Sequence, residues 1–138
     1  MSADYILRLI QQISMILAGI ISQRQRGQTT RALEEIEKSC LEHVGLPLIV
    51  IKQSTPEDLA ALLETGGHLR VTRSLILAEL LREEAIICEM NGNAPSASIS
   101  YAHAERLLCD ALPFLGPGEK EHFEGRLADI SAKRRDLG

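Results

Sequence analysis

The chain has 138 residues, of which 45% are apolar, 25% are charged and only 3% are aromatic. This length and composition predict a single folded domain, residues 1–138, with a core of Leu, Ile and Ala, and they exclude a disordered chain. The formal net charge of -4 argues against a nucleic-acid binder, because that function needs a basic face to neutralise phosphates.

Apolar residues recur every three or four positions, which predicts helices, and no stretch alternates strictly enough to predict a sheet. The first predicted helix covers residues 4–23 and the second covers residues 29–44. Gly27 lies in the turn between them and Gly45 ends the second helix, since glycine favours the backbone conformation found at helix ends. The N-terminal third of the chain is therefore predicted to be a helical hairpin.

The segment LPLIVIKQS follows this hairpin, and we interpret it as an extended, packed connector because Pro47 is unfavourable in a paired strand. The next segment, STPEDLAALLETGG, predicts a short third helix. Ser54 or Thr55 is expected to cap its start, and Gly66 and Gly67 are expected to end it.

Three more helices are predicted in the C-terminal half, over residues 72–90, 95–112 and 119–134. Gly92 lies in the turn between the first two of these, and the last helix has too few apolar residues to form the core. The predicted fold is therefore an all-α, compact bundle of about six helices.

The two best-defined hairpins repeat each other at an offset of 65 residues. Each has a Gly turn followed by a helix with small residues seven apart and a larger apolar residue between them. The matched pairs are Gly27 and Gly92, Ala32 and Ala97, Ile36 and Tyr101, and Ser39 and Ala104. Small residues at this spacing allow two helices to approach closely, so we expect repeat-like antiparallel hairpins.

This pattern resembles the tetratricopeptide repeat, which also places small residues and an aromatic around a Gly turn. Residues 78–111 match it best, through Leu81, Ala85, Cys88, Gly92, Ala97, Tyr101 and Ala104. The first hairpin departs from it at Gly19 and Gln23. The segments DYILRLIQQ and LREEA also resemble a small group of uncharacterised bacterial repeat-like proteins, a resemblance that implies no activity. An irregular bundle with small contact residues would imitate part of this pattern.

The first helix is apolar over an arc of roughly 200°, which is wider than the usual core-facing stripe. One neighbouring helix cannot cover such an arc, so the helix is either sandwiched within the domain or packed on a second copy in a homodimer. The candidate self-association face comprises Tyr5, Ile6, Leu9, Ile13, Ile16, Leu17 and Ile20. Its polar side lacks a row of Lys and Arg, which disfavours a membrane-surface role.

Glu84 falls inside the apolar arc of its helix, where an unpaired carboxylate would be very costly. We expect a buried ion pair with Arg8, because the first helix is the expected neighbour. A structural ion pair explains this arrangement more simply than a catalytic site.

No catalytic, cofactor or metal site is predicted. Cys40 and His43 share an apolar face, and Glu119 with His122 forms a single E-x-x-H unit, whereas a metal site needs three or four ligands. His103 is expected on the polar, exposed side of its helix. The three cysteines are widely spaced within apolar patterns, which favours free thiols in a reducing cytoplasm.

The N-terminus does not predict a secretory leader, and its apolar run over residues 13–21 is far shorter than the roughly 20 residues of a membrane span. The leading functional hypothesis is a cytoplasmic, non-catalytic module that binds a protein or peptide or associates with itself, without nucleic acid or membrane as partner. The alternative is a small-ligand sensor or enzyme with a pocket near Glu84, Arg8 and His43.

Overall fold

The computed structural model describes residues 3–64 and 70–138, with side chains described from Leu7 onward in the first helix. These ranges form a compact all-α bundle with antiparallel neighbours, which confirms the predicted fold class, although it has seven α-helices. The helices are α1 (Ala3–Gln25), α2 (Thr29–Ser39), α3 (Leu48–Gln53), α4 (Pro56–Glu64), α5 (Arg70–Met90), α6 (Ala94–Ala111) and α7 (Pro117–Leu137). A π-helix, η1 (Cys40–Val44), extends α2, and a 3-10 turn, η3 (Leu112–Phe114), follows α6.

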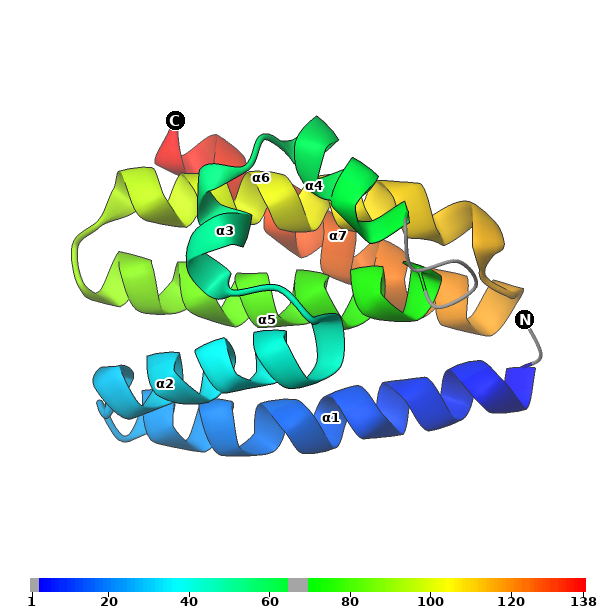
Figure 1. Cartoon of the computed structure of the whole chain (residues 1–138), viewed down its shortest axis with the longest axis horizontal. Coiled ribbons are helices and arrows are strands. Elements are labelled where there is room, and N and C mark those ends of the chain that lie inside the picture. The colour runs from blue at the N-terminus through cyan, green and yellow to red at the C-terminus, as the bar shows by residue number, and fades with distance from the viewer. Residues whose placement is uncertain (1–2, 65–69) are drawn as a thin grey trace.

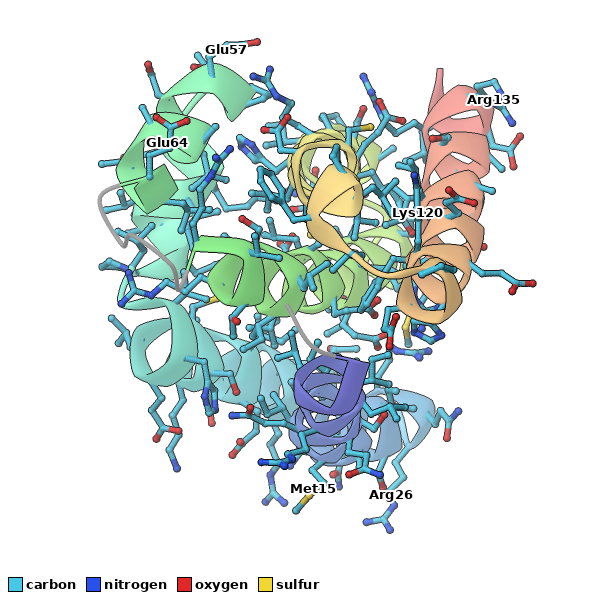
Figure 2. The ribbon with its side chains drawn as sticks, turned by 90° about the vertical axis from the view of Figure 1, so that its right-hand side faces the viewer. Met15, Arg26, Glu57, Glu64, Lys120 and Arg135 are labelled. Carbon is cyan, nitrogen blue, oxygen red and sulfur yellow. The ribbon has the colours of Figure 1, made fainter. Side chains whose placement is uncertain are left out.

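Helix α5 lies at the centre of the bundle. The α1–α2 hairpin packs along one side of it and α6 along the opposite side, and α7 lies beside α6 (Figure 1). Seen from the end, α4 and α7 stand on opposite sides of α6 (Figure 2). Because α5 is enclosed, it is buried without interruption from Ser74 to Leu81, on all sides of the helix.

The α1–α2 and α5–α6 hairpins turn in the same way. Gly27 and Gly92 have φ angles of 77° and 76°, in the left-handed region that favours glycine. In each turn the glycine N–H donates to the carbonyl three residues earlier at 3.0 Å, and the next N–H donates to the carbonyl five residues earlier at 2.8 Å. The 65-residue offset therefore relates two turns with matching hydrogen bonds.

The matched small residues after each turn are buried. Ala97 and Ala104 are fully buried where α6 lies against α5, and Tyr101 between them donates its hydroxyl to Glu89 at 2.5 Å. In the first hairpin the equivalent positions, Ala32, Ile36 and Ser39, are buried as well. Close helix approach thus accounts for the small residues in both hairpins.

The interpretation of LPLIVIKQS as an extended connector is wrong, because this segment contains α3. Pro47 occupies the N-cap with an extended backbone (φ -64°, ψ 143°), so its missing N–H removes no helical hydrogen bond. Its carbonyl instead accepts from the N–H groups of Val50 and Ile51. Ile51 is fully buried, and this tertiary contact favours the helix over the strand preference of its β-branched residues.

Thr55 caps α4, as one of the two predicted alternatives, because its hydroxyl accepts from the Asp58 N–H at 3.1 Å. The hydroxyl of Ser54 instead donates to the Val50 carbonyl. The predicted stop at Gly66 and Gly67 lies outside the described residues.

The apolar face of α1 is largely used within the chain. Leu9, Ile13, Leu17 and Ile20 are buried, and Ile16 is half-buried against the same core. Tyr5 and Ile6 lie outside the described side chains. Among the side chains of α1 that the structure describes, the large exposed apolar ones are instead Leu7 and Met15. Of the two predicted alternatives, packing within the domain or on a second copy, the structure supports packing within the domain for these four buried residues.

Replacing Ala104 with Leu should reduce the free energy of unfolding by about 1 to 3 kcal/mol, because the larger side chain has no room at the α5–α6 contact. Chemical denaturation monitored by circular dichroism measures this change. Ala128→Leu, at an exposed position of α7, is the control and should change stability by less than about 0.5 kcal/mol. Equal effects of the two substitutions would contradict the close packing.

Candidate functional site

Three carboxylates on α5 are buried, and each pairs with a cation from a different surrounding helix. The partners come from α7, α1 and α3, so the pairs link α5 to three other elements. The pairs are Glu79 with Arg126, Glu83 with Arg24 and Glu84 with Lys52, at N–O distances of 2.9, 2.8 and 3.0 Å. A buried carboxylate without such a partner would strongly destabilise the fold.

Glu84 belongs to a polar cluster between α3, α5 and α6. The Lys52 ammonium donates to the Glu84 carboxylate, to the Ser96 carbonyl at 2.8 Å and to the Ser100 hydroxyl at 2.5 Å. The Ser100 hydroxyl and the Cys88 thiol both donate to the same carboxylate. We call these five residues the Lys52 cluster. Since its polar atoms hydrogen-bond to one another, it anchors α3 to the bundle.

Glu84 is buried as expected, but its predicted pairing with Arg8 is wrong. Among the described residues, the ion pair of Glu84 is with Lys52, and Arg8 is exposed on α1. The side of α5 that faces α1 carries Glu83, which pairs with Arg24. Glu84 is the next residue, so its side chain points about 100° further around the helix, toward α3. His43 is half-exposed and lies 3.9 Å from Glu42 instead. The sequence did contain one signal for the partner of Glu84, namely a lysine, Lys52, within the apolar segment LIVIKQ.

The buried thiols are poor nucleophiles. Burial, reinforced by the charge of Glu84, raises the pKa of Cys40 to about 12. Burial and the hydrogen bond to Glu84 also raise the pKa of Cys88. Cys109 is exposed, contrary to its apolar sequence pattern. Because the thiolate is the reactive form of cysteine, the geometry does not favour thiol catalysis in the Lys52 cluster.

The prediction that His103 is exposed is wrong, because its side chain is only 1% exposed on a helix against which α4 packs. Burial, and then the positive charge of Lys52, lower the pKa of His103, while the backbone at Ser54 opposes part of this shift. The position of α4 is a tertiary feature, so the local helical pattern contained no signal for this burial.

Replacing Lys52 with Met should reduce the free energy of unfolding by about 3 kcal/mol or more, because the buried Glu84 carboxylate loses its counter-charge. The double variant Lys52→Met with Glu84→Leu should lose less than the single variant, since it leaves no buried charge. Thermal and chemical denaturation of both proteins provide the measurement. A double variant less stable than the single variant would contradict the charge argument.

His103 should make the fold sensitive to mild acid. Its pKa is lowered in the folded chain, so as pH falls below the ordinary value of 6.5 the unfolded chain takes up the proton first. Stability is then lost progressively until the pH is below the folded-state pKa. Melting temperatures between about pH 7.5 and pH 5.5 should depend less on pH in His103→Gln than in the wild type. The exposed His122→Gln is the control, and identical slopes in all three proteins would refute the assignment.

A groove of about 200 Å³ opens on the outer side of α3, between this helix and η1. We call it the α3 groove, and its lining residues are Glu37, Leu41, Pro47, Leu48 and Ile49. Ile49 is 65% exposed and Leu41 is 56% exposed. Large apolar side chains thus gather at a hollow of the surface.

The α3 groove depends on the inner side of the same short helix. α3 has six residues, and within them Ile51 is fully buried while Lys52 enters the polar cluster. The other wall belongs to α2 and η1, which pack on α5. Anchoring of α3 from inside therefore fixes the position of Ile49 on the outside.

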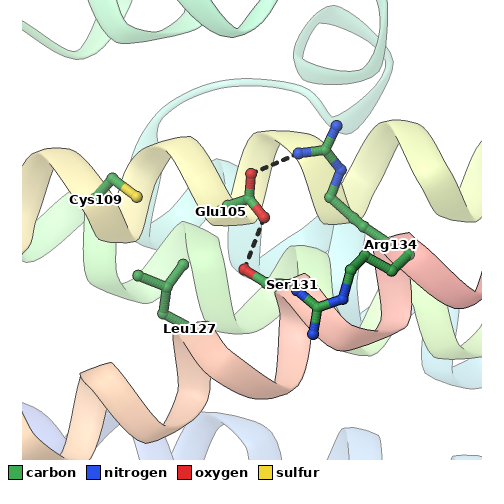
Figure 3. Close-up of a pocket in the computed structure, with 6 residues that line it drawn as sticks. Glu105, Cys109, Leu127, Ser131 and Arg134 are labelled. Atoms are coloured by element: carbon green, nitrogen blue, oxygen red, sulfur yellow. Dashed lines mark hydrogen bonds and ion pairs between the residues drawn. The ribbon is translucent and has the colours of Figure 1, made fainter.

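A second hollow, of about 410 Å³, lies between α6 and α7. Glu105 of α6 accepts hydrogen bonds there from Ser131 and Arg134 of α7, at 2.8 and 2.5 Å (Figure 3). Cys109 and Leu127 line the same hollow. Its acidic group is already paired, so these contacts join α6 to α7.

The chain matches no protein-family model, no curated protein and no solved structure at a significant level. The resemblances to tetratricopeptide repeats and to the bacterial group therefore stay predictions. Within residues 3–64 and 70–138, no helix is long and apolar enough to cross a membrane. In the same ranges, no group of three or more His, Cys, Asp or Glu side chains is placed to hold a metal ion.

Proposed function

We propose that this protein is a non-catalytic interaction module that binds an apolar segment of another protein in the α3 groove. The observation that carries the proposal is the exposure of Ile49 and Leu41 at the edges of a groove. Large exposed apolar side chains that gather around a hollow are typical of protein-binding surfaces. A partner side chain inserted there would remove both residues from water.

The groove is formed by helices that are anchored to the core, which favours binding. Both walls are helical, and α3 is held by the ion pair of Lys52 with Glu84. A preorganised surface loses little conformational entropy when it binds, so more of the contact energy appears as affinity.

We also propose that the α1–α2 and α5–α6 hairpins are diverged units of a tetratricopeptide-like repeat, as found in many interaction modules. The matching hydrogen bonds at Gly27 and Gly92 and the buried small residues at equivalent positions support this relation. A cytoplasmic location is part of the proposal, and the three free cysteines are in keeping with it.

A different protein, rather than a second copy, is the partner we favour. The predicted self-association face of α1 includes four residues that are already buried within the chain. The alternative of a ligand site near Glu84, Arg8 and His43 has less support, because the polar atoms around Glu84 pair with one another and Arg8 is exposed elsewhere.

Selection of a displayed peptide library on the wild-type chain tests the proposal. Peptides that bind should lose about tenfold or more in affinity to Ile49→Ala and to Leu41→Ala, because each change removes apolar surface from the groove. Both residues are exposed, so the two variants should keep the melting temperature of the wild type.

Met15→Ala is the matched control. Met15 is 79% exposed and points away from the bundle on α1 (Figure 2). This variant should bind selected peptides as the wild type does. The proposal fails if no selected peptide is sensitive to Ile49 and Leu41, or if Met15→Ala weakens binding equally.

A further inference from the structure

We infer that the partner segment is a basic amphipathic helix, with an apolar side chain in the α3 groove and Lys or Arg side chains beside Glu34 and Glu37. The inference rests on the proposed function and adds the conformation and charge of the partner. It is carried by the placement of unpaired carboxylates next to the exposed apolar residues.

The acidic side chains and the apolar groove form one stripe. Glu34, Glu37 and Leu41 are three and four residues apart, so they follow one another along α2 and η1. Glu37 itself lines the groove and Glu34 lies one turn before it, and both are exposed. A partner helix laid along this edge would meet two carboxylates and then the apolar hollow.

These carboxylates are available to a partner. The ion pairs along this edge involve Glu42 with Lys38 and with His43, each at 3.9 Å. In the described part of the chain, neither Glu34 nor Glu37 forms an ion pair. A basic side chain from outside would therefore gain an attraction that the fold leaves unused.

The other wall of the groove offers no compensating cation. Between Lys38 and Arg70, Lys52 is the only Lys or Arg in the sequence. Its ammonium is turned inward, to Glu84, Ser96 and Ser100. The C-terminal end of η1 at Gly45 adds the negative end of a helix dipole. The negative charge beside the groove thus comes from the α2 and η1 wall, and the α3 wall adds no cation to neutralise it.

A helix fits this surface better than an extended peptide. An extended peptide gains most of its affinity by pairing with an exposed sheet edge, and the described residues contain no strand. Helical walls instead accept the ridge of another helix, whose apolar and basic residues recur at the same three- and four-residue spacing.

The composition of peptides selected on the wild-type chain tests the inference. Peptides that depend on Ile49 should be enriched in Lys and Arg at helical spacing and depleted in Asp and Glu, compared with the unselected library. Their affinity should fall about fivefold in the double variant Glu34→Gln with Glu37→Gln, and by a similar factor when NaCl is raised from about 50 to about 500 mM. Circular dichroism of a representative peptide should show helix gained on binding.

The double variant Glu121→Gln with Glu124→Gln is the control, since it removes two exposed carboxylates from α7 and should leave affinity unchanged. Ile49-dependent peptides without basic enrichment, or bound in an extended form, would overturn this inference and leave the proposed function intact. Absence of any Ile49-dependent peptide would overturn both. An Ile49-dependent dimer of the chain alone in sedimentation would also overturn the inference, by naming a second copy as the occupant.

Discussion

The burial of three carboxylates on α5 is the constraint on which the arrangement of the bundle depends. Glu79, Glu83 and Glu84 are each less than 5% exposed, and none of them is tolerable there without a counter-charge. Arg24, Lys52 and Arg126 come from three different helices, and Glu83 also pairs with Arg82 of α5 itself, so the pairs favour particular positions of α1, α3 and α7 around α5. Apolar packing drives the collapse of such a bundle, and we expect these pairs to discriminate between the helix orders that packing alone would accept.

The same constraint links the interior to the proposed interaction surface. α3 is too short to hold its place through apolar contacts alone, and it is attached by Ile51 and Lys52. The inward direction of Lys52 satisfies Glu84 and at the same time removes a positive charge from the outer surface. The absence of a cation from the α3 wall of the groove is therefore a direct result of how the core is neutralised. Because Lys52 belongs to both the core pair and the α3 wall, a substitution at this position would change the core and the surface together.

The sequence predicted those features that depend on neighbouring residues, such as helix turns and close helix contacts. Gly27 and Gly92 marked the turns because only glycine readily adopts their backbone angles, and the spacing of Ala97 and Ala104 indicated the close helix contact. The helix of α3, the burial of His103 and the partner of Glu84 were missed. Each is decided by a segment distant in sequence, namely by the core around Ile51, by α4 and by α3, respectively. The groove was missed for the same reason, since it exists only once α3 is folded against η1.

The distribution of the thiols has a practical consequence for labelling chemistry. The pKa of all three thiols is raised, but Cys40 and Cys88 are buried, whereas Cys109 is exposed on α6 beside α7. A maleimide dye added to the folded protein should therefore attach at one place, without any engineered cysteine. That place belongs to the α6–α7 hollow, whose lining residues are different from those of the α3 groove. The native chain thus contains its own attachment point for a fluorescent reporter, separate from the surface at which a partner is expected.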